Sequence, residues 1–191
     1  MKNWHSQQYI NNGENLKIPD NIIKNAVSIA EKVIKNRGQI LPIFTLAHLA
    51  KQSETKLETL DVLVKRQQLK PDTPNYRVFS IRKNSPKNLD KRMICVPCKE
   101  LYNVQSFINK NVLVHLNSHS AVVSYKKGSK IYVAAKYHCE SKWLIKIDLK
   151  DFFDSINEVH VYRVYRNIGY SPLLSFQMAK LCTRVIPNRA K

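Results

Sequence analysis

The sequence predicts an α+β fold, in which a helical first part is followed by a β-hairpin, further helices and one short strand. Apolar residues recur at helical spacing within residues 20–68, and large apolar and polar residues alternate over residues 76–81. Hydrophobic residues make up 43% of the 191 residues, which is enough to bury a core. A chain that is disordered throughout is therefore excluded.

The first predicted helix begins at Pro19 and Asp20, where proline and an acidic residue suit a helix start. Its apolar positions follow helical spacing and would form one buried face: Ile22, Ile23, Ala26, Val27, Ala30, Val33 and Ile34. Gly38 follows a run that contains two basic residues, which is typical of a helix end.

Two more helices are predicted before residue 75. They cover about residues 43–50 and 56–68, and Ser53 is the predicted cap of the second. Residues 1–15 are rich in Asn and Gln and are predicted to form an irregular lead-in.

A β-hairpin is predicted next. Residues 76–81 alternate like a strand, residues 83–88 contain turn-forming Asn, Ser and Pro, and residues 92–96 return as the second strand. Pro97 ends that strand, because proline cannot donate to a strand ladder.

Helices and one strand are predicted after the hairpin. The helices cover about residues 101–116 and 131–138, with a basic, glycine-containing loop at 125–129 between them. A mostly apolar strand follows at residues 143–148. Residues 157–185 are predicted to be mostly helical, with a break at 169–172.

The chain is strongly basic. Lys and Arg number 32 against 14 Asp and Glu, a net charge of +18. Residues 76–142 carry 13 basic and 3 acidic groups (+10), against +4 in residues 1–75 (11 and 7) and +4 in residues 143–191 (8 and 4). Such an excess favours a polyanionic partner, most commonly nucleic acid. A lysine-rich surface that serves only solubility is the alternative.

The sequence predicts a cytoplasmic protein without a membrane partner. No apolar run approaches the roughly 20 residues that span a bilayer. The first residues are polar and lack the apolar stretch of a secretory signal. The four cysteines form no dense framework and are expected to stay reduced.

Asp148 is the first candidate for chemistry. An apolar strand that ends in an aspartate places a carboxylate at the rim of a sheet, and Mg²⁺ prefers such oxygen ligands together with substrate phosphates. Two such ions can stabilise the attacking and leaving oxygens of a phosphoryl transfer. Taken alone, an aspartate at this place is more typical of a turn or a helix cap than of a metal ligand.

Residues 147–156, Ile-Asp-Leu-Lys-Asp-Phe-Phe-Asp-Ser-Ile, resemble motif A of the prokaryotic reverse transcriptases, the group of retron, group II intron and defence-associated enzymes. Other segments resemble further parts of that family in the right order. Residues 76–83 and 92–97 resemble its fingers hairpin, residues 104–108 the next helix, and residues 124–131 the segment before the palm. The resemblance covers roughly residues 40–180, with several ordered motifs.

The resemblance implies a division into a helical N-terminal region at 1–75, a fingers-like hairpin with helices at 76–142, and a partial palm at 143–191. It also implies RNA-directed DNA synthesis, in which a primer 3′-hydroxyl attacks the α-phosphate of a dNTP on an RNA template. Mg²⁺, or Mn²⁺ in its place, would be the metal, and the partners would be the RNA template, the DNA primer and the dNTP.

Individual roles follow from the same resemblance. Asp148 would be a catalytic, metal-binding carboxylate, assisted by the backbone carbonyl of Leu149. Phe153 would lie beneath the sugar of the incoming nucleotide and exclude a 2′-hydroxyl. Lys83 and Arg92 would grip the triphosphate.

Simpler interpretations stand beside these roles, because Phe153 could pack in a core and the basic pair could be a solvated hairpin face. Further basic residues would contact nucleic acid: Arg82, Lys126, Lys127 and Lys130.

The sequence departs from the family after motif A. The Leu-Pro-Gln-Gly core and the Tyr-x-Asp-Asp hairpin, which supplies the second essential carboxylate, do not occur among the 191 residues. We therefore expect the polypeptide alone to be inactive, and to be a truncated product, a fragment, or one half of a split polymerase completed by a second chain. The rival hypothesis is a non-catalytic module that binds RNA or single-stranded DNA, with tyrosines for base stacking.

The compact spacing between residues 125–129 and Asp148 is more similar to retron and defence-type enzymes than to intron-encoded ones. That subfamily implies a role in antiviral defence, with a cognate non-coding RNA or an effector protein as further partners.

Overall fold

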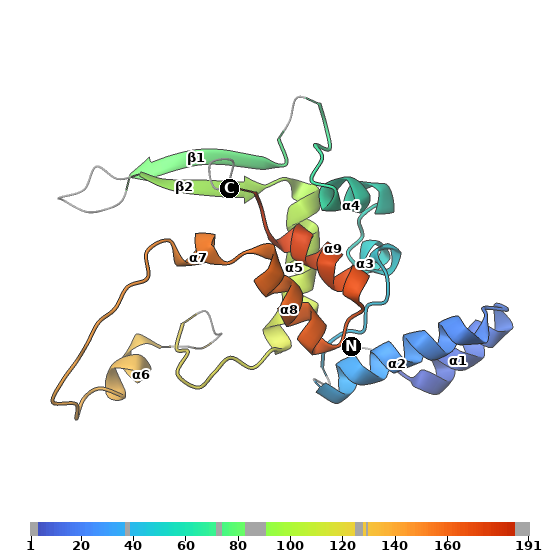
Figure 1. The fold of residues 1–191 in the computed structure, drawn as a ribbon, viewed down its shortest axis with the longest axis horizontal. Coiled ribbons are helices and arrows are strands. Elements are labelled where there is room, and N and C mark those ends of the chain that lie inside the picture. Colours follow the sequence, from blue (N-terminus) through green and yellow to red (C-terminus); the bar gives the residue numbers. More distant parts are fainter. Residues whose placement is uncertain are drawn as a thin grey trace. The chain divides into compact units, whose positions relative to one another are not determined.

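The computed structural model describes residues 4–36, 39–71, 74–82, 91–124, 128 and 130–185. The chain divides into two compact units. Unit 1 joins Met1–His115 to Asn157–Lys191, and unit 2 is Leu116–Ile156. The described residues are mostly helical, with a small antiparallel sheet, which confirms the α+β class (Figure 1).

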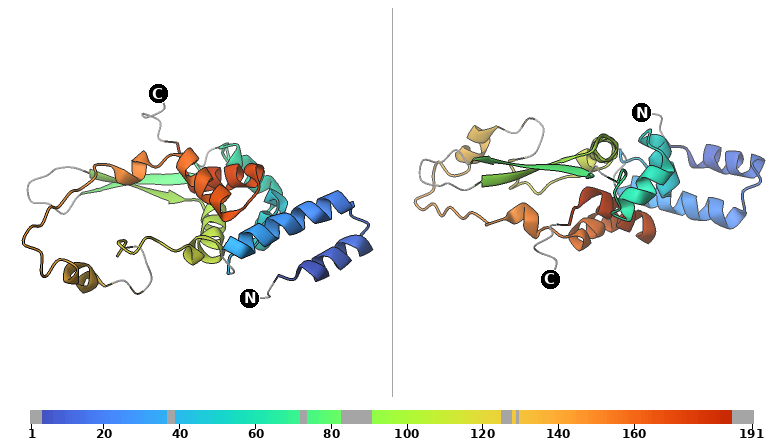
Figure 2. Two further views of the ribbon diagram at one scale, coloured as in Figure 1. Left: turned by 60° about the horizontal axis from the view of Figure 1, so that its bottom comes forward. Right: turned by 90° about the horizontal axis from the view of Figure 1, so that it is seen from above.

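Unit 1 contains most of the regular structure. Its elements, in chain order, are α1 (Ser6–Asn15), α2 (Asp20–Asn36), α3 (Leu46–Gln52), α4 (Leu57–Val64), β1 (Tyr76–Arg82), β2 (Lys91–Pro97), α5 (Lys99–Asn111), the short 3₁₀ helix η1 (Leu113–His115), α8 (Glu158–Ile168) and α9 (Pro172–Cys182). Within unit 1, α8 and α9 return late in the sequence to pack against α2, α4 and α5 (Figures 1 and 2).

The helix predicted from Pro19 and Asp20 is confirmed as α2. Its predicted apolar face is buried at four positions, namely Ile23, Ala26, Ala30 and Val33. Gly38, the predicted end of this helix, lies outside the described residues.

The helices predicted at 43–50 and 56–68 are confirmed as the shorter α3 and α4. Thr45 caps α3, because its hydroxyl accepts a hydrogen bond from the backbone N–H of His48 at 3.1 Å. The prediction that Ser53 caps the next helix is wrong. Ser53 ends α3, and its buried hydroxyl donates to the carbonyl of Leu49 at 2.8 Å.

The prediction of an irregular lead-in over residues 1–15 is also wrong, because α1 forms there. Two contacts hold α1 in place. Tyr9 packs on Phe44 with ring centroids 5.4 Å apart, and Gly13 is buried against the side chain of Ile23, where an added β-carbon would lie 2.7 Å from Cδ1. Figure 2 shows α1 lying along α2. Tertiary packing therefore stabilises a helix whose polar composition hides it.

The predicted hairpin is confirmed. β1 and β2 pair antiparallel in a register that runs from Tyr76 opposite Pro97 to Arg82 opposite Lys91. The predicted turn at 83–88 lies outside the described residues. The hairpin is exposed, since Val78, Phe79 and Ile81 keep between 41% and 50% of their surface accessible.

The helical stretch predicted at 157–185 is confirmed as α8 and α9, and the predicted break falls between them. Asn157 begins α8 with a capping box, in which its side chain accepts from the backbone of His160 and His160 Nδ1 accepts from the Asn157 backbone. Gly169 ends α8 at φ +120°, and a β-carbon there would lie 3.2 Å from the backbone nitrogen of Val33 in α2. Glycine is therefore needed for the close approach of these helices.

Unit 2 contains α6 (Ile131–Lys136) and the four-residue α7 (Phe152–Ser155). The strand predicted at 143–148 is absent, because the structure records no strand pairing over these residues. A strand forms only with a hydrogen-bonding neighbour, and the described part of the chain gives this segment none. Among all the residues that the structure describes, no helix is long and apolar enough to cross a membrane.

The fold predicts that removal of the Tyr170 hydroxyl lowers the stability of the folded chain. Tyr170 is fully buried, and its hydroxyl donates to the Leu41 carbonyl at 2.6 Å. Tyr170→Phe leaves that carbonyl without this donor and is expected to lower the free energy of unfolding by about 1–2 kcal/mol in urea titrations. The control is Tyr102→Phe, since Tyr102 is 59% exposed. Equal losses of unfolding free energy in Tyr170→Phe and Tyr102→Phe would contradict a stabilising role of this hydrogen bond.

A second prediction concerns alkaline pH. Burial raises the pKa of both Tyr165 and Tyr170 above the ordinary tyrosine value. Above about pH 10 the unfolded chain loses these protons while the folded chain keeps them, so the free energy of unfolding falls as pH rises. Each tyrosine contributes up to about 1.4 kcal/mol per pH unit. Urea titrations should show a shallower fall for Tyr170→Phe than for the natural chain, and parallel slopes would refute this.

Candidate functional site

Asp148 lies in unit 2, in the segment that resembles motif A. Its side chain is exposed, and so is the neighbouring Leu149, at 63% of its surface. Residues 143–149 are irregular, and the short α7 follows. The carboxylate of Asp148 is therefore open to solvent.

The two other aspartates of this segment lie at the start of α7. Asp151 precedes the helix in the left-handed region, with φ 53°, and Asp154 lies in its first turn. Asp151 makes no side-chain cap hydrogen bond.

Phe153 lies in α7 and is 65% exposed. Its ring meets that of Phe152 edge to face, with centroids 5.5 Å apart. Core packing, the simpler interpretation of this residue, does not describe its position. Its predicted role beneath a nucleotide sugar stays a prediction.

The apolar side chains before Asp148 are unusually exposed. Trp143, Leu144, Ile145 and Ile147 keep 90%, 72%, 84% and 79% of their surface accessible. Isolated exposed apolar residues are common, whereas a contiguous exposed apolar run is typical of an interaction surface.

Two of the predicted basic residues lie in unit 1, on the part of the hairpin farthest from α5. Arg92 is opposite Ile81, and Arg82 is opposite Lys91. Because successive residues of a strand point to opposite faces, Arg82 and Arg92 lie on different faces of the hairpin. Both are exposed. Lys83, the predicted partner of Arg92, lies outside the described residues.

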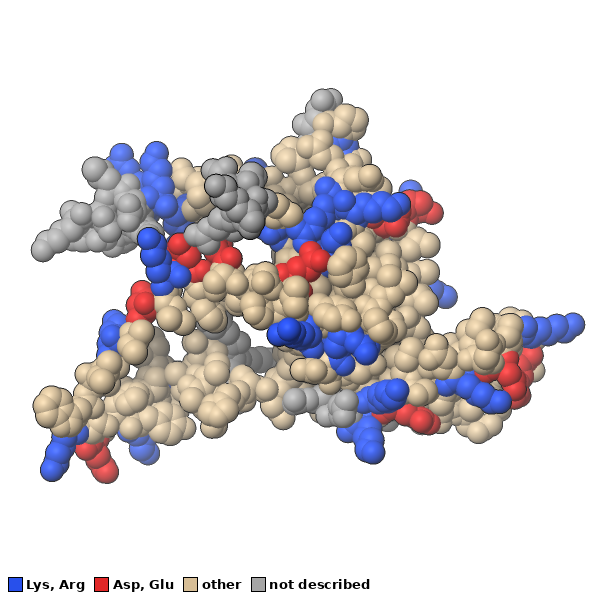
Figure 3. Space-filling view, viewed as in Figure 1, with Lys and Arg blue, Asp and Glu red and all other residues tan. Residues whose placement is uncertain are grey.

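The other predicted nucleic-acid contacts lie in unit 2. Lys130 is exposed just before α6, and its Nζ lies 5.8 Å from the ring centroid of Tyr132. Lys126 and Lys127 lie outside the described residues. Figure 3 shows Lys and Arg side chains over both the hairpin and the helices of unit 1 rather than in a single stripe.

The described residues do not assemble a metal site. Within them, no group of three or more His, Cys, Asp or Glu side chains is placed to hold a metal ion. Asp148 offers one carboxylate, whereas Mg²⁺ bound by protein needs further oxygen ligands.

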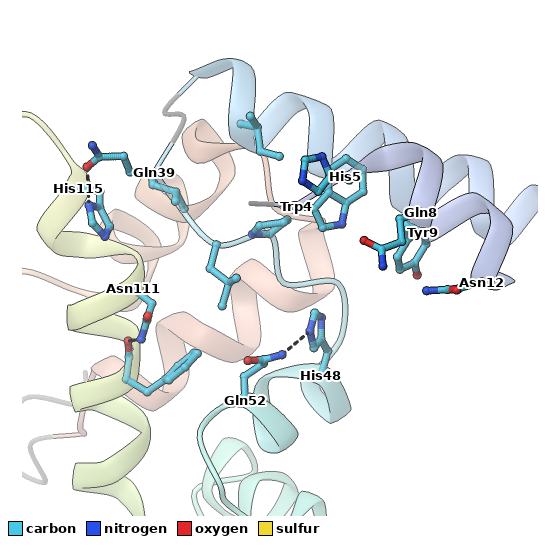
Figure 4. A pocket seen from close by; sticks show the side chains of 15 residues that line it. Trp4, His5, Gln8, Tyr9, Asn12, Gln39, His48, Gln52, Asn111 and His115 are labelled. Carbon is cyan, nitrogen blue, oxygen red and sulfur yellow. Dashed lines mark hydrogen bonds between the residues drawn. The ribbon is translucent and has the colours of Figure 1, made fainter. Parts of the chain in front are cut away.

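The structure also contains a cavity that the sequence analysis missed. It has a volume of about 820 Å³ and lies in unit 1 among α1, α3, α5 and residues 39–42 (Figure 4). Trp4, His48 and His115 are among its lining residues. Because they are far apart in the sequence, no local motif connects them. The half-buried positions Ser6, Tyr9 and Ile10, with the buried Gly13, carry a helical period that could have indicated α1.

Comparison with known proteins gives a consistent set of relatives. No family model matches the chain. The chain is 30% identical over 152 residues to the retron Ec86 reverse transcriptase of Escherichia coli, which covers 78% of this chain and 44% of the relative. It is 33% identical over 96 residues to the retron Ec83 reverse transcriptase of Escherichia coli, and 32% identical over 105 residues to the retron Mx162 reverse transcriptase of Myxococcus xanthus.

These two matches cover 50% and 53% of this chain, and 28% and 22% of the relatives. The chain therefore spans less than half the length of the curated relatives it matches.

Proposed function

Because the chain is a homologue of retron reverse transcriptases over part of their length, we propose that it forms the fingers and the first part of the palm of an RNA-directed DNA polymerase. The observation that carries the proposal is the similarity over 152 residues, which is 78% of the chain. The reaction would join a primer 3′-hydroxyl to the α-phosphate of a dNTP on an RNA template and release pyrophosphate. The proposed parts are a helical N-terminal region at residues 1–75, the fingers at 76–142 and a partial palm at 143–191.

Asp148 is the proposed catalytic carboxylate, and it would bind Mg²⁺, or Mn²⁺, with help from the carbonyl of Leu149. Its exposure supports this, because an open carboxylate is accessible to a metal-bound nucleotide. The described residues lack the other ligands, so we assign no reaction step to the metal. Phe153 is proposed to limit space at the sugar, since its ring is exposed five residues after Asp148.

The basic residues are proposed to bind the nucleotide and the nucleic acid. Arg92, with Lys83, would bind the triphosphate, because a guanidinium offers paired donors to phosphate oxygens. Template and primer would meet a second group of cations: Arg82, Lys126, Lys127 and Lys130. The net charge of +18 supports this distribution of roles.

The exposed apolar run over residues 143–147 suggests how the palm becomes complete. As a strand it would need neighbouring strands to pair with its backbone, and elements packed on the faces of that sheet would cover the side chains that are exposed in unit 2. These strands and the further carboxylates would come from additional polypeptide. It would be either part of the same gene product or a separate second chain. The proposal thus includes a split polymerase as one form.

The cellular role is proposed from the retron relatives. A cytoplasmic location, a function in antiviral defence, and a cognate non-coding RNA or an effector protein as partner would fit such an enzyme. A second candidate is a non-catalytic module that binds RNA or single-stranded DNA. It is favoured by Tyr132 and Tyr137, which are 64% and 69% exposed and available for base stacking.

The 191-residue polypeptide alone is expected not to extend a primer. Two-metal catalysis needs more carboxylates than Asp148 supplies, and the sequence contains no Tyr-x-Asp-Asp. The measurement is incorporation of labelled dNTP on an RNA template with Mg²⁺. Incorporation that disappears in Asp148→Ala would overturn this expectation.

Activity is expected once the polypeptide that carries Tyr-x-Asp-Asp is present, joined to this chain or added to it. In that assembly Asp148→Asn should lower kcat by about 10²–10³, because it removes a charge that stabilises the reaction centre. Asp154→Asn, six residues on, is the matched control and should keep most of the activity. Templated synthesis that is insensitive to Asp148→Asn would disprove the role of Asp148. If no such assembly synthesises DNA but the chain still binds RNA, the non-catalytic module is the better description.

A further inference from the structure

The 820 Å³ cavity of unit 1 has the size of a small-molecule site. Its walls come from α1, residues 39–42, α3, α5 and η1 (Figure 4). All of these elements belong to unit 1, whereas Asp148 belongs to unit 2. None of the residues proposed for polymerisation is among those that line the cavity.

Three polar atoms of the cavity lining are buried without a hydrogen-bond partner. They are Nε1 of Trp4, Nδ1 of His48 and Nε2 of His115. Buried polar groups are nearly always satisfied, because leaving one without a hydrogen bond is energetically costly. Three such atoms around one cavity indicate capacity to bind a ligand by hydrogen bonds.

The neighbours of the two histidines define what each free nitrogen can do. His48 Nε2 lies 3.2 Å from the amide nitrogen of Gln52, which donates, so Nδ1 carries the ring proton. His115 Nδ1 lies 3.2 Å from the amide oxygen of Gln39, to which it donates, so in the neutral ring Nε2 is an acceptor. With the indole N–H of Trp4, the cavity offers two donors and one acceptor.

The described lining of the cavity is uncharged and partly aromatic. Among the residues that the structure describes, it contains no Asp, Glu, Lys or Arg. Along one side Trp4 contacts Tyr9 at a centroid distance of 6.1 Å, and His48 stacks on Phe44 at 5.3 Å with an interplanar angle of 23°. Burial, followed by the charge of Lys51, lowers the pKa of His48, which favours its neutral form. An uncharged, flat, hydrogen-bonding ring fits such a site.

A second cavity adjoins the first. It has a volume of about 710 Å³ and shares Trp4, His5 and Ile34 with the neutral one. Its lining adds Lys32 and Lys35 of α2, together with Glu31. Two ammonium groups beside one carboxylate leave a positive balance, which suits a phosphate.

We propose that these two adjoining cavities bind a nucleotide, with the base in the neutral cavity and the phosphate near Lys32 and Lys35. The chemistry is the same for a free nucleotide and for one nucleotide of a single strand. In both cases the base would stack beside Trp4 and pair with the free nitrogens of His48 and His115.

Trp4 provides the readout. The chain has two tryptophans, and the other, Trp143, is 90% exposed, so Trp143→Phe leaves Trp4 as the sole indole fluorophore. The full chain with this substitution would be titrated with ribonucleoside monophosphates up to about 5 mM, so that binding with a Kd in the millimolar range is still detected. Parallel titrations would use a single-stranded oligoribonucleotide and an abasic strand of the same length.

Saturable quenching of Trp4 is expected with ligands that carry bases and not with the abasic strand. If a mononucleotide saturates the signal and competes with the oligonucleotide, the site takes free nucleotides. If only the oligonucleotide saturates it, the site takes a base of a single strand. Each result supports the proposal and identifies the source.

Substitutions test the assigned atoms. His48→Phe keeps a ring on Phe44 but removes the donor, and it should weaken binding about tenfold, the discrimination expected for one base contact. His115→Leu removes the acceptor and serves as a second variant if the first does not fold. His138→Phe is the matched control, because His138 is exposed in unit 2.

Lys35→Gln separates the two cavities. It should weaken binding of a monophosphate and leave binding of the corresponding nucleoside unchanged. With the oligonucleotide, Lys35→Gln should also lower the slope of log K against log salt concentration by about one, the amount for one lost phosphate contact. His48→Phe should leave that slope unchanged.

The proposal is overturned if no base-carrying ligand quenches Trp4 saturably, or if His48→Phe and His115→Leu both bind as tightly as the His138→Phe control. Neither result depends on primer extension, so this proposal and the polymerase proposal can fail independently.

Discussion

The core of unit 1 depends on the return of the chain after residue 156. α8 and α9 pack against helices formed more than 60 residues earlier, at α2, α4 and α5. Polar contacts fix this return: the Arg66 guanidinium pairs with Glu158 and bonds Thr183 Oγ1 at 3.1 Å, and Gln105 donates to the Leu181 carbonyl at 2.8 Å. The hairpin and the cavity are both built on helices that this closure holds together.

Local patterns predicted most of this architecture. The apolar face of α2, the alternation in β1 and the break at Gly169 each occur within one element, so the sequence displays them directly. α1 escaped prediction because its helical period is made of Ser, Tyr, Ile and Gly, and packing on Phe44 and Ile23 supplies its stability. Residues 143–148 have the composition of a strand, but pairing is a property of two segments and cannot be read from one.

The candidate sites divide in the same way. Asp148 and Phe153 could be named because they lie in one short segment with a recognisable order, and the structure shows them exposed. A metal site could not be predicted beyond one carboxylate, and the residues that the structure describes hold no group of three or more His, Cys, Asp or Glu placed to bind a metal ion. The cavity beside Trp4 had no sequence signal at all: its histidines come from α3 and η1, and only the folded chain makes them neighbours.

The topology of unit 1 has a mechanical consequence. Its two sequence segments, before residue 116 and after residue 156, are held to one another by buried side chains and by hydrogen bonds such as that from Tyr170 to Leu41. The peptide bonds of unit 2 are therefore not what keeps α8 and α9 against α5. We expect that after a backbone break within residues 116–156 the two polypeptides can still associate through these contacts, so the integrity of the core does not depend on the covalent continuity of unit 2.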